Sequence, residues 1–316
     1  LNKIINKKNE ILNSLSLKYK YSYSKNFIKR LIRSYKSITI IGMGGSILGM
    51  KAIYSFLKFK IKKKFLFIDN LNPIQKKEIN TKNLNLIISK SGNTLETISN
   101  TNILIKKKQK NIFLTENTNN YLRNLALKLK AEIVDHNNFI GGRYSVLSEV
   151  GMLPASLAGL NDRKFKRLNS LIKNKKFLNS LLISVSNIFY FTQKKKFNSI
   201  IINYDESSDD LFKWYQQLVA ESLGKKQKGI LPIISTMPKD NHSLMQLYLD
   251  GPKNSFFTFF SVEEKNSDRI KSDMILKSHL YLRNKSINQI LQSQISATEK
   301  VFNEKNLPFR SFKILK

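Results

Sequence analysis

The sequence predicts an α/β protein with two βα domains, each a parallel sheet sandwiched between helices. Three observations lead to this fold class. Short runs of β-branched and aromatic residues recur along the 316-residue chain, amphipathic helical patterns lie between them, and a longer helical stretch divides the strands into two series. Strands that alternate with helices form parallel sheets covered on both faces. A chain of this length is also long enough to bury two domain cores.

The first series contains five expected strands, with helical patterns at residues 47–57 and 121–130 among them. These strands cover residues 37–41, 64–69, 84–89, 111–115 and 131–134. A helical stretch then runs from residue 150 to about 191. The second series is expected at residues 199–204, 229–234, 255–262 and 309–315. We therefore expect an N-terminal helical segment over 1–36, a first domain over 37–155 and a second over 156–316.

The composition excludes several classes of protein. The chain has no Cys, which excludes a disulfide framework, a thiolate nucleophile and a cysteine metal site. No run approaches the ~20 apolar residues of a membrane span. The first residues, LNKIINKKNEILNSL, lack the uninterrupted apolar core of a signal peptide. We expect a soluble cytoplasmic protein that does not bind membranes.

The charge balance is strongly basic, with 55 Lys+Arg against 22 Asp+Glu and a formal net charge of +33. Nucleic-acid binding is one interpretation of such a charge. The basic residues are mostly lysines in scattered runs, however, and arginine, the usual reader of bases, is sparse. No helix-turn-helix, zinc-finger or RNA-recognition motif accompanies them. A general compositional bias is the favoured interpretation, so we expect no nucleic-acid partner, although a positive field would attract anionic substrates.

The stretch IISKSGNTLET, residues 87–97, joins an expected strand to an expected helix. Such a turn offers unpaired backbone N–H groups and a partial positive charge to an anion. Gly92 allows close approach of the backbone, and four hydroxyls follow one another at Ser89, Ser91, Thr94 and Thr97. An ordinary helix cap needs one hydroxyl rather than four. The surplus predicts a cradle for a phosphate monoester.

The earlier turn IGMGGSILG, residues 41–49, also follows an expected strand. It lacks the third glycine of a dinucleotide fingerprint, because Ile47 stands at that position, and it lacks a Gly-Lys-Ser/Thr ending. Gly44, Gly45 and Ser46 are candidates for close approach to a small ligand.

Five motifs together resemble those of the glucose-6-phosphate isomerase (phosphoglucose isomerase) family, within the sugar-isomerase (SIS) superfamily. They are GMGGS at 42–46, SKSGNTLET at 89–97, GGRYS at 141–145, QLVAESLGK at 217–225 and DNHSLMQL at 240–247. The resemblance implies two SIS-type domains, each with a five-stranded parallel sheet. It implies a homodimer with shared active sites that interconverts glucose 6-phosphate and fructose 6-phosphate in glycolysis and gluconeogenesis, without a cofactor or metal. The substrate-binding residues would be Gly45, Ser46, Ser89, Lys90, Ser91, Gly92, Asn93, Thr94, Thr97 and Gln217.

Glu221 is the candidate base. Aldose–ketose isomerisation moves a proton between neighbouring carbons through an enediolate, which one carboxylate can do. Glu221 lies at the end of an amphipathic helix that Gly224 terminates, where a negative charge is disfavoured unless it has a function. The resemblance makes Glu221 the base that moves the proton between C2 and C1, and places Gln217, one turn earlier on the same face, against the substrate.

Arg143 and His242 are the other two catalytic candidates. A fixed guanidinium stabilises developing negative charge, and by resemblance Arg143 stabilises the enediolate. A histidine titrates near neutral pH, and by resemblance His242 opens the sugar ring. His136 and His279 match no motif and are interpreted as structural or surface residues.

Three alternatives stay open at this stage. A dual-specificity isomerase would also accept mannose 6-phosphate. A non-catalytic SIS protein would only bind phosphosugars, but would need no catalytic Glu, Arg and His. A nucleic-acid-binding protein is the most distant. The resemblance also implies a C-terminal helical segment with a lysine that assists His242, and Lys313 and Lys316 lie too early to match it. We therefore expect a C-terminally truncated isomerase that is poorly active.

Overall fold

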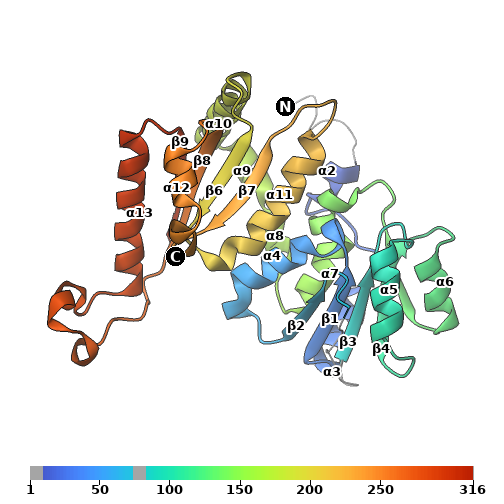
Figure 1. Ribbon diagram of the computed structural model, residues 1–316. Coiled ribbons are helices and arrows are strands. Elements are labelled where there is room, and N and C mark those ends of the chain that lie inside the picture. The colour runs from blue at the N-terminus through green and yellow to red at the C-terminus, as the bar shows by residue number, and fades with distance from the viewer. Residues whose placement is uncertain (1–9, 74–82, 316) are drawn as a thin grey trace. The chain divides into compact units, whose positions relative to one another are not determined.

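The computed structural model describes residues 10–73 and 83–315, which form two compact units (Figure 1). The first unit comprises Leu1–Leu181 with Lys213–Leu218, and the second comprises Leu182–Phe212 with Val219–Lys316. The division in the chain falls within helix α10 (Lys175–Gln193), later than the expected boundary at 155/156, and α11 (Asp209–Leu223) contributes residues to both units. Each unit is described separately below.

The first unit contains a five-stranded parallel sheet with the order β2-β1-β3-β4-β5. Its strands are β1 (Ser37–Gly42), β2 (Lys64–Ile68), β3 (Asn83–Ile88), β4 (Lys110–Glu116) and β5 (Glu132–His136). All neighbouring pairs are parallel. The five strands expected from the sequence are confirmed, with ends that differ by no more than two residues.

The helices of the first unit connect and cover these strands. They are α2 (Glu10–Ser14), α3 (Lys25–Ser34), α4 (Leu48–Leu57), α5 (Leu95–Leu104), α6 (Tyr121–Lys128), α7 (Glu149–Leu157), α8 (Asp162–Phe165) and α9 (Leu168–Lys173). The 3-10 turns η1 (Gly44–Ser46), η2 (Lys58–Lys60) and η3 (Gly142–Leu147) complete the unit. The helical stretch expected from residue 150 to about 191 is thus divided among α7, α8, α9 and α10.

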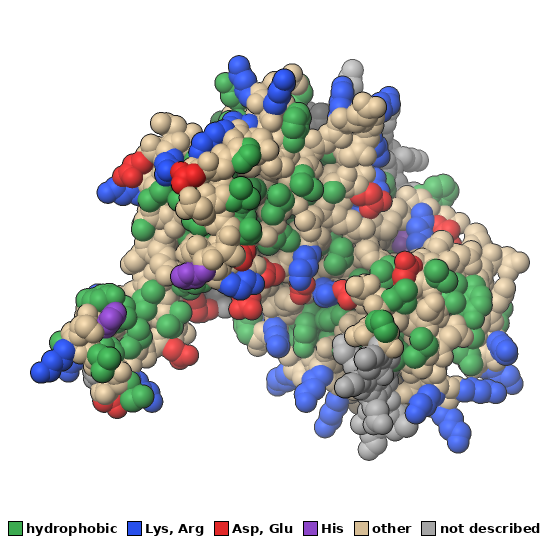
Figure 2. All heavy atoms as spheres, viewed as in Figure 1, with side chains coloured by type: hydrophobic (Ala, Val, Ile, Leu, Met, Phe, Trp, Pro, Cys, Tyr) green, Lys and Arg blue, Asp and Glu red, His purple; other side chains and the backbone are tan. Residues whose placement is uncertain are grey.

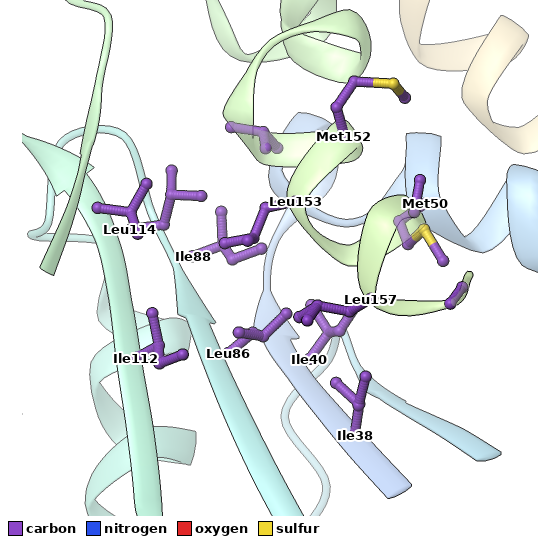
Figure 3. Packing of buried hydrophobic residues seen from close by; sticks show 14 of the residues in the cluster. Ile38, Ile40, Met50, Leu86, Ile88, Ile112, Leu114, Met152, Leu153 and Leu157 are labelled. Atoms are coloured by element: carbon purple, nitrogen blue, oxygen red, sulfur yellow. The ribbon is translucent and has the colours of Figure 1, made fainter. Parts of the chain in front are cut away.

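Alternate residues of the strands enter two different cores. Ile38 and Ile40 of β1 belong to the core that also contains Leu153 and Leu157 of α7, where side chains from sheet and helix meet (Figure 3). Ile41, on the opposite face of β1, belongs to a second core with residues of α5 and α6. Both faces of the sheet are therefore covered, which confirms the expected sandwich.

A group of buried charges holds the segment before α3 against α7 and α8. The Tyr19 hydroxyl donates to Glu149 Oε2 at 3.0 Å, and the Ser22 N–H donates to Glu149 Oε1 at 3.1 Å. Lys166 Nζ lies 4.4 Å from the ring centroids of Tyr19 and Tyr21. Burial raises the pKa of Glu149 above its usual value. Burial also lowers the pKa of Lys166 to about 8, although Asp162 and Glu149 oppose this shift.

The second unit contains a four-stranded parallel sheet with the order β7-β6-β8-β9. Its strands are β6 (Asn198–Asn203), β7 (Leu231–Thr236), β8 (Ser255–Glu263) and β9 (Phe309–Leu315). The four strands expected from the sequence are confirmed. The resemblance implied five strands in this sheet, and the described residues form four. The unit also contains α12 (Met245–Asp250), α13 (Ile287–Glu304) and the 3-10 turns η4 (Glu206–Ser208), η5 (Lys239–His242), η6 (Ser272–Met274) and η7 (Lys277–Leu282).

Aromatic contacts show how helices cover the second sheet. Phe257 and Phe259 of β8 pack edge-on against Phe302 of α13, with centroids 4.9 and 5.2 Å apart. On the opposite face, Phe256 stacks on Phe191 of α10, and Phe260 packs on Phe212 of α11. This sheet also lies between helices, as the sequence predicts.

The surface agrees with a general excess of lysine. Lys and Arg side chains are spread over the visible faces of both units and do not form one stripe (Figure 2). Across residues 10–73 and 83–315, none of the helices has the length and apolar character needed to cross a membrane.

Candidate active site

The loops that follow β1, β3, β4 and β5 all leave the same edge of the first sheet, because these strands are parallel. In parallel α/β sheets, ligands bind beyond this carboxyl edge. An open pocket of about 400 Å³ lies there, lined by Ser46, Ser89, Lys90, Ser91, Thr94 and Glu116. Five of these six residues were expected from the sequence to bind substrate, and the structure brings them together from the loops after β1 and β3.

Gly92 shapes the turn between β3 and α5. Its N–H donates to the Ser89 carbonyl at 3.2 Å, and its φ of +65° lies in the left-handed region that favours glycine. A β-carbon at this position would come within 1.9 Å of Asn120 Oδ1. The close approach that the sequence suggested at Gly92 is therefore made to Asn120, which caps α6 by accepting from Arg123 N at 2.9 Å.

Thr94 precedes the first residue of α5 but does not cap it with its side chain. Its hydroxyl instead shares a hydrogen bond of 2.9 Å with the Ser89 hydroxyl. The first-turn N–H groups of α5 thus receive no acceptor from the Thr94 side chain, whereas both hydroxyls line the pocket. This arrangement differs from an ordinary Thr cap and leaves the positive end of the helix directed at the pocket edge.

Lys90 is the cation of the pocket, and two acceptors fix its ammonium group. Lys90 Nζ lies 3.1 Å from Glu116 Oε1 and donates to the Asn138 carbonyl at 2.7 Å. The backbone of Lys90 is also fixed, because its carbonyl accepts from the Glu116 N–H at 3.0 Å and from the Thr115 hydroxyl at 3.2 Å. A lysine ammonium has three donors, so one remains for a ligand. Sequence reasoning missed Glu116, which lies 26 residues beyond its partner.

The GMGGS and GGRYS motifs lie against each other. A β-carbon on Gly45 would come within 2.3 Å of the Gly142 carbonyl group, so only glycine permits this contact between η1 and η3. The Ser145 hydroxyl donates to the Gly142 carbonyl at 2.5 Å and lies 3.3 Å from the Gly45 carbonyl. Gly45 therefore serves the packing of the two loops and does not line the pocket.

Arg143 and Gln217 lie beside these loops in the first unit. The Arg143 guanidinium is half-buried and lies 4.8 Å from the centroid of the Tyr144 ring. A β-carbon on Gly44 would meet Gln217 Nε2 at 2.8 Å, which places the Gln217 amide against the GMGGS turn. The structure therefore places Gln217 against the turn that contains Ser46, and Arg143 within η3.

Two expected phosphate ligands have other surroundings. Thr97 is 1% exposed, and its hydroxyl has no hydrogen-bond partner among the described residues. Asn93 accepts from the Tyr121 N–H at 3.0 Å and so fixes the start of α6. Neither residue lines the pocket.

The remaining catalytic candidates belong to the second unit and are exposed. Glu221 lies in the last turn of α11. His242 ends η5, and Asp240 organises the backbone before it by accepting from Thr236 N at 2.8 Å and from the Ser235 hydroxyl at 3.1 Å. In the described parts of the chain, no three His, Asp or Glu side chains are grouped as metal ligands.

Comparison with known proteins gives consistent matches over most of the chain. A family model described as phosphoglucose isomerase matches residues 6–236. The chain is 33% identical over 305 residues to a glucose-6-phosphate isomerase of Methanocaldococcus jannaschii, covering 90% of this chain and 75% of that protein. It is 31% identical over 294 residues to a glucose-6-phosphate isomerase of Campylobacter jejuni, covering 86% and 72% of the two chains.

Two solved structures share the fold. A hypothetical protein of Thermus thermophilus superposes with a TM-score of 0.78 at 22% identity, covering 98% of this chain and 80% of that one. A glucose-6-phosphate isomerase of Chlamydia trachomatis superposes with a TM-score of 0.68 at 19% identity, covering 92% and 62%. At these identities the structures support the fold, which agrees with two parallel sheets flanked by helices.

Proposed function

Because this chain belongs to the phosphoglucose isomerase family, whose members isomerise phosphosugars, we propose that it interconverts glucose 6-phosphate and fructose 6-phosphate. The observation that carries the proposal is the pocket at the carboxyl edge of the first sheet. Its hydroxyls, its single cation and the N-terminus of α5 are suited to a phosphate monoester. The names of the relatives from Methanocaldococcus jannaschii and Campylobacter jejuni supply the choice of sugar.

In this proposal the phosphate binds to Ser89, Ser91, Thr94 and the free donor of Lys90. Ser46 lines the same pocket from the loop after β1 and takes part in binding the ligand. Thr97 and Asn93 would act indirectly, by supporting the first turn of α5 and the start of α6. Gly92 and Gly45 would contribute through backbone that no side chain obstructs.

Glu221 is the proposed base. It removes the proton from C2 of the open-chain aldose, which leaves an enediolate, and returns a proton to C1 to form the ketose. The Arg143 guanidinium stabilises the negative charge of the enediolate oxygens, since it cannot lose its own proton. His242 transfers the proton that opens the sugar ring, and Gln217 positions the sugar by hydrogen bonding. A proton also moves from O2 to O1 in the enediolate, so substrate and product contain the same atoms and no cofactor is consumed.

The proposal extends to the setting of the reaction. We place it in glycolysis and gluconeogenesis in the cytoplasm, carried out by a homodimer in which His242 serves the neighbouring subunit's site. Subunit mixing tests the shared site. Glu221→Gln and His242→Ala chains, each inactive alone, should regain part of the activity after proven subunit exchange, and no recovery would show that each site is built from one chain.

The test of the function is an assay of fructose 6-phosphate conversion coupled to glucose-6-phosphate dehydrogenase. The proposal predicts turnover that is abolished by Glu221→Gln. A parallel reaction with mannose 6-phosphate distinguishes a single from a dual specificity. Binding of fructose 6-phosphate without any turnover would instead identify a non-catalytic phosphosugar-binding protein.

A further inference from the structure

His136 lies next to the phosphate pocket without lining it. It is the last residue of β5 and pairs in register with Glu116, the last residue of β4. The side chain is 2% exposed. Its Nδ1 lies 2.8 Å from the Asn137 carbonyl, which can only accept, so Nδ1 carries the hydrogen and donates it. Its Nε2 has no hydrogen-bond partner among the described residues.

A short chain of contacts connects His136 to the pocket. The imidazole fixes the carbonyl of Asn137, and the carbonyl of the next residue, Asn138, accepts from Lys90 Nζ at 2.7 Å. Glu116 is the second partner of Lys90, at 3.1 Å. The direction of the third donor of Lys90 therefore depends on where the backbone at Asn137 and Asn138 is held.

Electrostatics set the protonation state of this histidine. Burial lowers the pKa of His136, and the positive charge of Lys90 acts in the same direction, whereas the Asn137 hydrogen bond and the negative charge of Glu116 oppose the shift. Lys90 and Glu116 are the ionised groups that act on the ring. The nearby Arg123 pairs with Asp135 at 2.8 Å. A protonated His136 would place a second cation beside Lys90 and would compete with it for Glu116.

We propose that His136 is a positioning residue for phosphate binding: in its neutral form it holds the Asn137–Asn138 turn so that Lys90 directs its remaining donor into the pocket. The inference rests on the proposed function of the pocket. It predicts an effect on affinity and KM rather than on kcat, because His136 does not contact the reacting carbons. It also predicts that phosphate binding weakens when His136 becomes protonated, which burial moves below the ordinary pKa of histidine.

The test is calorimetric titration of the full chain with fructose 6-phosphate and with inorganic phosphate, at several pH values from about 4.5 to 8. His136→Leu removes the hydrogen bond to Asn137, and His136→Asn retains a donor at the place of Nδ1 but cannot titrate. At pH 7.5, His136→Leu should weaken binding by about five- to tenfold, as expected when one charge-assisted hydrogen bond is misdirected. His136→Asn should stay within about twofold of wild type.

The pH series and a double variant make the test specific. Wild type should lose more affinity on acidification than His136→Asn, in which only the ligand titrates. In a Lys90→Met background, His136→Leu should have no further effect, because its route of action is gone. Equal affinities of wild type and His136→Leu, or equal pH profiles of wild type and His136→Asn, would overturn this inference alone. A wild-type chain that binds neither ligand would overturn both the phosphate site and the inference.

Discussion

The proposed binding residues of the first unit and the proposed acid–base residues of the second differ in how they are held. In the first unit, Ser89 is 2% exposed, the Gly92 turn is closed by hydrogen bonds, and Lys90 has two fixed acceptors. In the second unit, Glu221 and His242 have exposed side chains on an ordered backbone. The proposed binding residues are thus held in place by packing and hydrogen bonds without a ligand, whereas the side chains proposed for proton transfer are exposed. We therefore expect substitutions of the binding residues to change the affinity for the ligand, and substitutions of Glu221 or His242 to change kcat.

The largest expected effect is on chemistry, from Glu221→Gln. This change preserves size and hydrogen bonding but removes a carboxylate that accepts protons, so kcat should fall by about 10³-fold while the Kd for fructose 6-phosphate changes less than about threefold. The coupled assay and a calorimetric titration measure the two quantities. Glu206→Gln, an exposed carboxylate in the same unit, is the matched control and should leave both unchanged. A large rise in Kd with an unchanged kcat would show that Glu221 acts in binding. The proposed division between binding in the first unit and proton transfer in the second would then be wrong.

The next effect is on the organisation of the pocket, from Gly92→Ala. The φ of +65° and the contact of 1.9 Å with Asn120 Oδ1 should together cost about 2–4 kcal/mol of unfolding free energy and disrupt phosphate binding. Two controls separate the causes. Gly159→Ala has a positive φ but nothing within 4 Å, and Gly142→Ala has neither feature. Denaturant unfolding should rank the three variants in that order, and a Gly92→Ala chain as stable as Gly142→Ala would contradict the packed turn.

A smaller effect is expected from Thr94→Val, which keeps the shape of the side chain and removes the hydroxyl that faces Ser89. Loss of one hydrogen bond to a phosphate should weaken binding of fructose 6-phosphate by about tenfold without changing kcat. Thr101→Val is the control on the same helix, since the Thr101 hydroxyl is buried and has no hydrogen-bond partner among the described residues. If the two variants bind fructose 6-phosphate equally well, Thr94 is not a ligand.

The smallest effect concerns the buried charges of the first unit. The folded-state pKa of Lys166, about 8, lies below the ordinary lysine value of 10.5. Between these values the unfolded chain binds more protons than the folded chain, so the free energy of unfolding should rise with pH, by at most about 1.4 kcal/mol per unit. The raised pKa values of Tyr21 and Tyr23 act in the opposite sense above pH 10.

Denaturant unfolding at pH 8, 9 and 10 measures this slope. Lys166→Met fills the space between the rings of Tyr19 and Tyr21 with an uncharged chain and should flatten the profile. The exposed Lys213 offers a control, because Lys213→Met should keep the wild-type slope. If the free energy of unfolding of the wild type does not change between pH 8 and 10, protonated Lys166 does not destabilise the folded chain.

The elements of the fold were predictable because each carries a local signal. All six residues of β3, NLNLII, are buried, and four of them are Leu or Ile. A short run rich in aliphatic residues is typical of a strand in a parallel sheet. The turn at Gly92 was also recognisable, since glycine and hydroxyls between a strand and a helix have few other uses. No local sequence pattern predicts the order of the strands in the sheet.

That missing information explains what sequence reasoning did not find at the pocket. Glu116 and His136 become neighbours only because β4 pairs with β5, and Glu116 reaches Lys90 only because β3 pairs with β4. Thr97 shows the opposite failure. Its hydroxyl fits the motif, yet its position in the first turn of α5 turns it into the core. The spacing of the motifs predicted the loops that form the pocket. Which of their side chains line it depends on burial in the folded structure.

The most direct test of the central claim follows the proton itself. Wild-type chain is incubated in D₂O with glucose 6-phosphate to partial conversion, and the deuterium at C2 of the recovered substrate is measured by NMR. The account predicts deuterium at C2 with wild type, none above background with Glu221→Gln, and the same affinity for the ligand in both. Deuterium incorporation by Glu221→Gln at the wild-type rate would contradict the claim that Glu221 moves the proton.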